Sequence, residues 1–240
     1  MLTKTRDGIC PHQNQLLAAL SAVERERIFP HLQLVSMALG KVLSEPGNVQ
    51  RYGYFPIDCI VSFSYLMKNG ASTEIAVAGN EGLVGLALCT GAQKTRSRAI
   101  VQSAGNAYRL GGERLKVEFH RGGGLQAVLL RYTHAVMTQI AHTAACNRHH
   151  TVDQQLCRSL LAYLDRVSSN QLSLTQELIS NMLGVRREGV NSAATKLQSL
   201  GAIRYSRGQI IIVDRSKLER ESCECYTAIK KETERLVSAP

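Results

Sequence analysis

The spacing of apolar positions between residues 174 and 213 predicts two helices followed by a hairpin. Thr175 suits the N-cap of the first helix, because its hydroxyl can accept a hydrogen bond from a free backbone N–H of the first turn. Gly184 supplies the permissive backbone that a tight turn needs, and the second helix is predicted over residues 186–199. The apolar positions that recur at helical spacing are Leu178, Ile179, Met182, Leu183, Val190, Ala193 or Ala194, and Leu197.

The segment after the second helix predicts two short strands joined by a turn. Gly201 ends the helix. The turn Ser206-Arg207-Gly208 then separates expected strands at 203–205 and 209–213. Two helices, a glycine turn and a hairpin are the layout of a winged helix-turn-helix, which indicates a DNA-binding regulator. Residues 184–217 contain seven Lys or Arg against two acids, so positive charge is concentrated where phosphates would lie.

The second helix carries polar side chains of the types that read base edges in the major groove. Arginine can bind guanine with two hydrogen bonds and Glu can accept from cytosine, and Arg187 and Glu188 lie near the helix start, where base contacts are usually made. Arginines on the hairpin are expected near phosphates, which position a protein without reading sequence. The candidate DNA-binding residues are Thr175, Arg186, Arg187, Glu188, Asn191, Ser192, Lys196, Arg204 and Arg207.

A protein-interaction module is the alternative for this region, with its arginines forming only a solvated face. The agreement of charge, turn chemistry and hairpin favours DNA binding.

The pattern over residues 32–110 is different, because short apolar runs are broken at close intervals by Gly, Pro and Asn. This pattern is typical of an all-β segment, and its regular spacing predicts a small barrel or roll that holds its own side chains or one small ligand. One or two short helices are expected before it, over residues 14–29. The expected strands are 33–39, 60–66, 73–78, 99–102 and 106–110.

One long helix is predicted over residues 125–147, a stretch without Gly, Pro or acidic residues. Its polar residues argue against a membrane span. A long apolar stripe needs a partner helix, so we expect a two-fold dimer seam that sets two recognition helices about one DNA turn apart. The alternative is that the stripe packs on the chain's own β domain. The stripe consists of Leu125, Leu129, Tyr132, Val136, Ile140 and Ala144.

The composition fits these predictions. The 240 residues suffice for two ordinary domains, and 44% of them are hydrophobic, enough to build both cores. The formal net charge of +10 favours a polyanionic partner such as nucleic acid, and no basic amphipathic arm or lipidation signal points to a membrane. The first 14 residues lack an apolar run, so we expect no signal peptide and a cytoplasmic protein. The seven cysteines, at scattered spacings, are expected to be reduced thiols.

The order of β-roll, long helix and winged helix-turn-helix resembles the Crp/Fnr family of bacterial transcription regulators. The resemblance is closest from Leu174-Thr175-Gln176-Glu177 to Arg186-Arg187-Glu188-Gly189-Val190. Tyr54-Phe55-Pro56 and Gly79-Asn80-Glu81-Gly82-Leu83-Val84-Gly85 look like the family's cyclic-nucleotide-binding-like sensor fold. The resemblance implies an α+β chain with a sensor roll over 1–123, a dimerisation helix over 124–150 and a winged helix-turn-helix over 151–240.

The resemblance also implies how DNA is read. The family's base-contacting Arg-Glu pair maps onto Arg187 and Glu188, whereas Ser192 stands where the family's best-known pattern has a further base-reading arginine. A different half-site preference is therefore expected. The implied partners are double-stranded DNA, a second copy of the chain and RNA polymerase. No cofactor is implied, and the sequence names no small-molecule effector.

The chain departs from the family pattern in the ligand-binding residues. Cyclic-nucleotide sensors of this fold use a Gly-Glu pair whose Glu holds the ribose hydroxyl, but here Gly85 is followed by Leu86, which cannot accept that hydrogen bond. Arg96-Ser97 and Arg98-Ala99 both match the phosphate-binding half. We therefore expect no tight cAMP binding. An unliganded roll, another anionic ligand held by Arg96 or Arg98, and a merely solvent-facing loop remain open.

Nitrogen and sulfur donors gather at the end of the long helix, and they could hold zinc or haem. The candidates are His142, Cys146, His149 and His150, which share one helical face at spacings i, i+4, i+7 and i+8. The alternative is an interdomain hinge, in which Thr151 caps the next helix over 152–166. Cys223-Glu224-Cys225 offers too few ligands for a site of its own, so a structural role is expected there.

Enzyme signatures are missing from the sequence. It has no Gly-rich phosphate loop, no nucleophile triad with a recognisable local signature and no HExxH motif, so we expect no enzyme. The competing hypothesis is a ligand- or metal-responsive regulatory protein that acts through a protein partner. Salt dependence separates the two, because DNA binding through several phosphates weakens steeply as salt rises.

Overall fold

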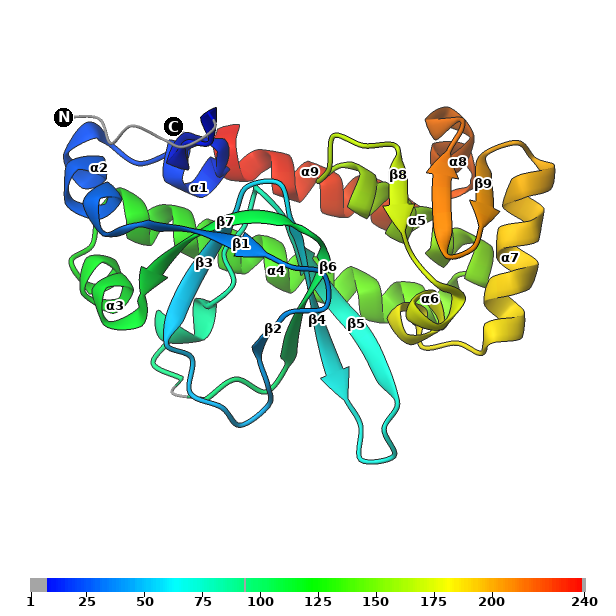
Figure 1. Ribbon diagram of the computed structural model, residues 1–240, viewed down its shortest axis with the longest axis horizontal. Coiled ribbons are helices and arrows are strands. Elements are labelled where there is room, and N and C mark those ends of the chain that lie inside the picture. Colours follow the sequence, from blue (N-terminus) through cyan, green and yellow to red (C-terminus); the bar gives the residue numbers. More distant parts are fainter. Residues whose placement is uncertain (1–7, 93, 239–240) are drawn as a thin grey trace. The chain divides into compact units, whose positions relative to one another are not determined.

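A computed structural model describes residues 8–92 and 94–238 of the chain (Figure 1). The chain divides into two compact units. Of the described residues, the first unit comprises 8–61, 78–92, 94–135 and 233–238, and the second unit comprises 62–77 and 136–232. The expected domain limits at residues 1 and 240, and the first seven residues of the segment searched for a signal peptide, lie outside the described residues.

Antiparallel sheet dominates the first unit, which confirms the α+β prediction. One sheet has the order β1-β7-β3, with β1 at Gln33–Met37, β7 at Gly105–Gly111 and β3 at Tyr52–Pro56. The other has the order β2-β6-β4-β5, and the outer part of its β4–β5 hairpin belongs to the second unit. Its strands are β2 (Val42–Ser44), β6 (Arg98–Ser103), β4 (Ile60–Leu66) and β5 (Ser72–Ala78).

Short helices lie before, between and after these strands along the chain. Asn14 caps α1 by accepting from the N–H groups of Leu16 and Leu17, and its own amide donates to two carbonyls, those of Pro56 and Gly82, at 3.0 and 2.9 Å. One buried side chain therefore joins a helix start to the sheet. The short helices are η2 (Pro11–Gln13), α1 (Gln15–Ala18), α2 (Ala22–Ile28), η3 (Phe29–His31), η4 (Leu86–Leu88) and α3 (Gly112–His120).

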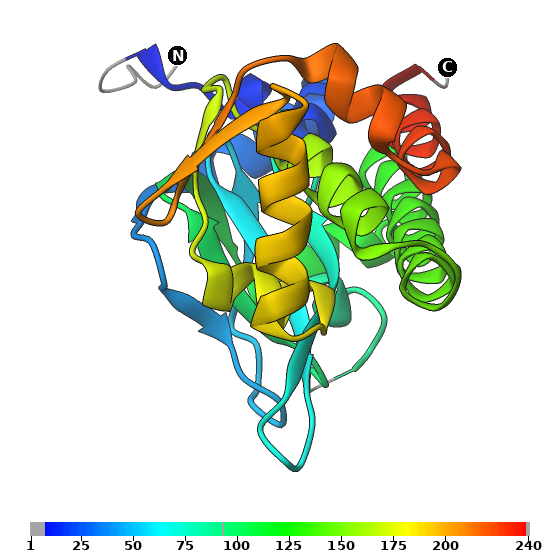
Figure 2. The ribbon, with the colours of Figure 1, turned by 90° about the vertical axis from the view of Figure 1, so that its right-hand side faces the viewer.

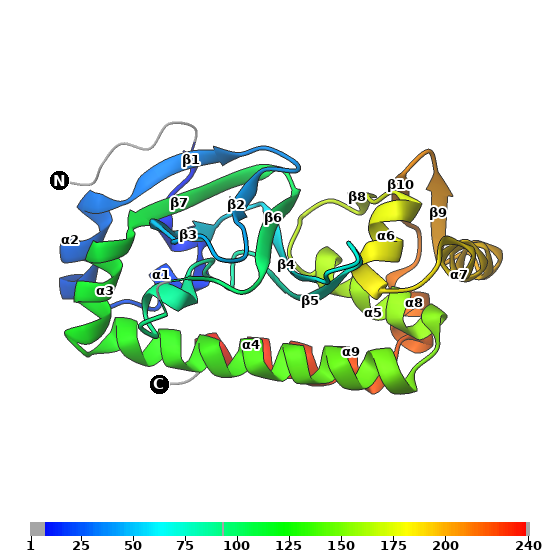
Figure 3. The same cartoon turned by 90° about the horizontal axis from the view of Figure 1, so that it is seen from below.

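The predicted long helix is α4, a single 26-residue helix at Gly124–His149 (Figure 3). Glu24 accepts from the N–H of Leu125 at 2.9 Å and so satisfies a free donor at the helix start. At about 1.5 Å per residue, α4 is about 39 Å long. Among the described residues, no helix combines the length and apolar character needed to cross a bilayer.

The predicted dimer stripe on α4 is wrong for its N-terminal half. Leu125, Leu129 and Tyr132 are at most 3% exposed within the single chain, so they pack in the core of the first unit. For these three residues the alternative prediction holds, namely that the stripe packs on the chain's own β domain. The apolar period predicts that one face of the helix is buried, but it does not identify the partner that buries it. Another face of α4 is exposed and mostly apolar, with His134 near its centre. It carries Ala127, Leu130, Met137, Ile140, Ala141 and Ala144.

The second unit contains the predicted winged helix-turn-helix. Its three-stranded sheet has the antiparallel order β8-β10-β9, in which the hairpin was predicted and the short β8 was not. The helices α8 and α9 were also not predicted. The elements after α4 are α5 (Val152–Leu164), β8 (Gln171–Ser173), α6 (Gln176–Leu183), α7 (Arg187–Ser199), β9 (Ile203–Ser206), β10 (Gln209–Ile212), α8 (Arg215–Glu221) and α9 (Glu224–Ser238).

Candidate nucleic-acid interface

Local chemistry fixes the turn between α6 and α7. Thr175 is the N-cap of α6 and accepts from the N–H of Leu178 at 3.1 Å, as predicted. Gly184 ends the helix in the left-handed region at φ +66°. A Cβ at Gly184 would also lie only 2.8 Å from Oγ1 of Thr73 on β5, so glycine is required both by the backbone and by close packing. Arg186 follows in extended conformation as the N-cap of α7, so the helix begins one residue after the predicted start.

The two faces of α7 differ in the way that groove reading requires. Val190, Ala193, Ala194 and Leu197 are at most 1% exposed and pack into the second unit. The polar positions are all on the surface, and α7 runs beside the β9–β10 hairpin (Figure 2). Every candidate DNA-binding residue is exposed: Thr175, Arg186, Arg187, Glu188, Asn191, Ser192, Lys196, Arg204 and Arg207.

Three polar contacts hold α7 to its neighbouring helices. Arg187 pairs with Glu177 of α6 at 3.1 Å, and Gln176 of α6 donates to Oδ1 of Asn191 at 3.2 Å. Lys196 donates to Asp153 of α5 at 2.6 Å, and this hydrogen bond raises the pKa of Lys196. Lys196 is therefore engaged with α5, whereas Arg187 and Asn191 are engaged with the helix that precedes the turn.

One further residue of this surface was not predicted. Thr195 is exposed and lies four residues after Asn191, on the same side of α7. Helical spacing from Asn191 is the signal that could have found it.

The tip of the hairpin presents Arg207 in a fixed conformation. Arg207 has φ +49° and is followed by Gly208 at φ +76°, which matches the two positive φ angles of a type I′ hairpin turn. The N–H of Tyr205 on β9 donates to Oε1 of Gln198 at 2.8 Å, and this bond ties the hairpin to α7. The wing and the recognition helix therefore form one connected surface within the second unit.

None of the four predicted ligand-binding residues is among those that line the pocket described below for the first unit. Gly85 has φ +131°, and a Cβ there would lie 3.0 Å from Cα of Gly53, so close backbone packing accounts for this glycine. Arg98 pairs with Glu45 at 3.0 Å, Arg96 is exposed and Ser97 is half-buried. A separate pocket of this unit is lined by Leu43, Val49, Gln50, Arg51, Tyr52 and Tyr54.

The predicted set of metal donors is divided by the structure. Cys146 and His150 come together with Cys223 and Cys225, whereas His149 is exposed, and neither His142 nor His149 is part of this group. Helical spacing holds for Cys146 and His150, since the N–H of His150 donates to the carbonyl of Cys146 at 3.0 Å, but His142 and His149 do not face the other donors. The two missing ligands come from the Cys-x-Cys pair that was judged incomplete on its own.

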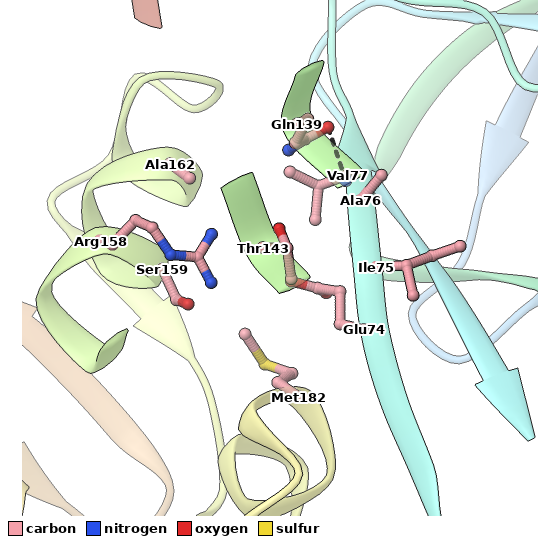
Figure 4. A pocket seen from close by; sticks show the side chains of 10 residues that line it. All are labelled: Glu74, Ile75, Ala76, Val77, Gln139, Thr143, Arg158, Ser159, Ala162 and Met182. Atoms are coloured by element: carbon pink, nitrogen blue, oxygen red, sulfur yellow. Dashed lines mark hydrogen bonds between the residues drawn. The ribbon is translucent and has the colours of Figure 1, made fainter. Parts of the chain in front are cut away.

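A small polar cavity lies between β5 and the helices α4, α5 and α6 of the second unit (Figure 4). It has room for about one water molecule, so it is not an effector pocket. Glu74 accepts from the hydroxyl of Tyr163 at 2.8 Å, and burial of its carboxyl group raises the pKa of Glu74. Arg158 is 7% exposed beside it.

Comparisons with known proteins agree with this architecture. Residues 154–221 match the Crp-like helix-turn-helix domain family. No curated protein matches the chain in sequence. The fold is similar to FixK2 from Bradyrhizobium japonicum, with a TM-score of 0.68 and 16% identity over 80% of this chain and 98% of that one.

Two further solved structures are similar. A putative transcriptional regulator of the Crp/Fnr family from Eubacterium rectale gives a TM-score of 0.66 and 17% identity over 88% of this chain and 97% of that one. A transcriptional regulator of the CRP family from Thermus thermophilus gives 0.65 and 18% identity over 78% and 96%. These matches confirm the predicted fold class.

Proposed function

We propose that this chain, which has the fold of Crp/Fnr-type transcription regulators and a Crp-like helix-turn-helix, is a homodimeric, sequence-specific DNA-binding regulator. One observation carries the proposal: every candidate contact residue on α6, α7 and the hairpin is exposed, while the apolar face of α7 is buried. A helix anchored in this way can enter a major groove without losing its packing.

The residues have separate roles in this proposal. Arg187 and Glu188, in the first turn of α7, read base edges, and Asn191 and Ser192 follow them one turn later. Arg204 and Arg207 of the hairpin contact phosphates and position the protein. We assign the exposed Thr175, Arg186 and Lys196 to phosphate contacts as well. No catalytic step is part of the proposal.

The exposed face of α4 supports a second copy of the chain as partner. Leu130, Met137 and Ala144 recur every seven residues, and Ala127, His134 and Ala141 each precede one of them by three. This is the alternation of a two-helix seam, in which a and d positions pack against a partner helix. Leu130 is 56% and Met137 63% exposed in the single chain, so both have surface left to bury. A two-fold dimer through this face supplies two recognition helices.

The sensor domain in this proposal does not bind cAMP tightly. Gly85 is followed by Leu86, which offers no acceptor to a ribose hydroxyl, and Arg98 is paired with Glu45. We place the protein in the cytoplasm, where a promoter-bound regulator acts on RNA polymerase as its further protein partner.

Selection on random-sequence DNA tests the proposal. The purified full-length chain is incubated with a random pool without added ligand, and the bound DNA is sequenced. A two-fold symmetric motif is the expected result, together with an affinity that falls steeply with salt, with a slope of about −0.9 per phosphate contacted. An unenriched pool, with and without cell extract, would contradict DNA reading and favour a regulatory protein that acts through a protein partner.

A further inference from the structure

Four metal-ligating side chains converge where α4 ends and α9 begins. Cys146 lies in the last turn of α4, His150 directly follows that helix, and Cys223 and Cys225 flank the first residue of α9. One donor atom from each of them lies within 4.8 Å of all the others. All four belong to the second unit, and they come from two segments that are more than 70 residues apart in sequence.

The distances between the donors fit a tetrahedral zinc ion. Zn–S bonds of about 2.3 Å and Zn–N bonds of about 2.0–2.1 Å place two sulfurs about 3.8 Å apart, and a sulfur and a nitrogen about 3.6 Å apart. Cys146 Sγ lies 3.5 Å from Cys223 Sγ, and Cys225 Sγ lies 3.7 Å from His150 Nδ1. All the donor atoms lie within 4.8 Å of one another, so they would need to move by about an ångström or less to bind the ion.

We propose that Cys146, His150, Cys223 and Cys225 bind one structural Zn²⁺ in a Cys₃His site. Three thiolates and an imidazole are a ligand set that zinc prefers, and four protein ligands leave no open position for catalysis. The three cysteines are at most 4% exposed, and they form a cluster of their own in the core. The site is therefore closed, as structural zinc sites are.

The surroundings of His150 fit a ligand that binds through Nδ1. That nitrogen faces Cys225, while Nε2 lies 3.2 Å from Oε2 of Glu224. Zinc-bound histidines commonly donate their other ring N–H to a carboxylate, which fixes the tautomer and the ring orientation. Glu224 is thus a positioning residue and not a ligand.

The charge around the site is also suited to a metal thiolate centre. Three thiolates, a neutral imidazole and Zn²⁺ sum to −1, and the buried guanidinium of Arg158 interacts with Cys146. Arg158 would offset the net charge that the completed site leaves in the core.

Zinc at this position would fix one end of α4 to the start of α9. The α8 helix, which precedes Cys223, packs against α5 of the helix-turn-helix. The ion would therefore connect the C-terminal part of α4 to the winged helix-turn-helix inside the second unit. This role is independent of whether the hairpin and α7 bind DNA.

Metal analysis of the untagged, full-length chain, purified under reducing conditions, tests the site. We expect about one zinc per chain by inductively coupled plasma mass spectrometry. After replacement of zinc by Co²⁺, the absorption spectrum should show the thiolate charge-transfer and ligand-field bands of a tetrahedral site. His150→Ala and Cys225→Ala should lose the zinc. The neighbouring His149→Ala and the buried Cys157→Ala are matched controls that should retain it.

A second variant tests the positioning residue without touching a ligand. Glu224→Gln should keep the site but weaken zinc affinity about tenfold in competition with a chelator. Circular dichroism shows whether each variant is folded, and cobalt spectra of the unaltered chain report on the site even if a ligand variant unfolds. A folded, reduced chain that holds no zinc and gives no thiolate–cobalt bands would overturn the proposal. A Cys146–Cys223 disulfide in protein purified without oxygen would overturn it as well.

Discussion

Arg187 Nη2 lies 3.1 Å from Oε2 of Glu177, so the residue that we assign to base reading is held by the first turn of the preceding helix. Both side chains are more than 60% exposed, and ion pairs of this kind contribute only about 0–1 kcal/mol. A guanine edge can therefore replace Glu177 as the partner of Arg187 at little cost. In the unbound protein, the pair orients the arginine away from α7 and toward α6.

Arg187→Ala should remove sequence discrimination more than general affinity. Loss of a bidentate base contact costs about 1–3 kcal/mol, so the ratio of affinities for the selected site and a scrambled site should fall by about 5- to 150-fold. Fluorescence anisotropy with both DNAs at fixed salt measures this ratio. Equal losses on the two DNAs would show that Arg187 contacts phosphates and not bases.

Arg207 should behave in the opposite way. Because Arg207 has φ +49°, Arg207→Gly removes the charge at the wing tip without adding backbone strain. All sequences should then be bound more weakly by a similar factor, and the salt slope should decrease by about 1. The same anisotropy series at several salt concentrations provides the measurement. A change confined to one DNA sequence would contradict the phosphate assignment.

The helix-turn-helix could be predicted from the sequence because its signals are local. Thr175 and Gly184 set the start and end of α6, and the buried positions of α7 follow the helical period. The strand β3 could not be predicted in this way, since it contains Gly53 and Pro56 and is held by pairing with β7, about 55 residues later in the chain. Tertiary pairing outweighs local propensity there.

The donor cluster shows the same limit for a site. Helical spacing placed Cys146 beside His142 and His149, but the fold brings it to Cys223, which lies 77 residues away. The stripe on α4 shows a related limit. Periodicity predicted that Leu125 and Leu129 are buried, but it did not predict that they are buried within the same chain and not against a second copy. Long-range contacts decide both cases, and no local pattern encodes them.

The α4 seam should be sensitive to charge at its centre. Met137→Glu places a carboxylate at the proposed two-fold contact, where it would meet the second copy, so the dimer should dissociate at micromolar concentration. Sedimentation velocity measures the change. Val23→Glu is a matched control, because Val23 is equally exposed at 63% but lies on α2. A Met137→Glu variant that remains dimeric would exclude this face as the seam.

Titration with cAMP should give no binding at concentrations that saturate a cyclic-nucleotide sensor. Leu86 leaves a ribose hydroxyl without an acceptor, and an unpaired buried polar group costs about 1–3 kcal/mol. Isothermal titration calorimetry on the full chain measures this directly. A stoichiometric binding isotherm with cAMP would contradict the expectation and would require an acceptor other than the residue after Gly85.

Glu74 should make the stability of the chain depend on pH in a defined direction. The residue is half-buried overall, but its carboxyl group is enclosed, and burial raises the pKa of Glu74 above the ordinary value of 4.5. Between 4.5 and the raised pKa, the folded state holds a proton that the unfolded state has lost. The free energy of unfolding contributed by this group therefore falls as pH rises through that window.

Two variants with opposite effects isolate this contribution. Glu74→Gln keeps the neutral form at every pH, so its stability relative to the unaltered chain should increase as pH rises above 4.5. Tyr163→Phe removes the hydroxyl that donates to Glu74 at 2.8 Å, so the pKa of Glu74 should rise further and the window should widen. Urea unfolding at several pH values between about 4.5 and 7 measures both differences. If the curves of the Glu74→Gln variant and the unaltered chain run parallel, then the carboxyl group of Glu74 is not buried in solution.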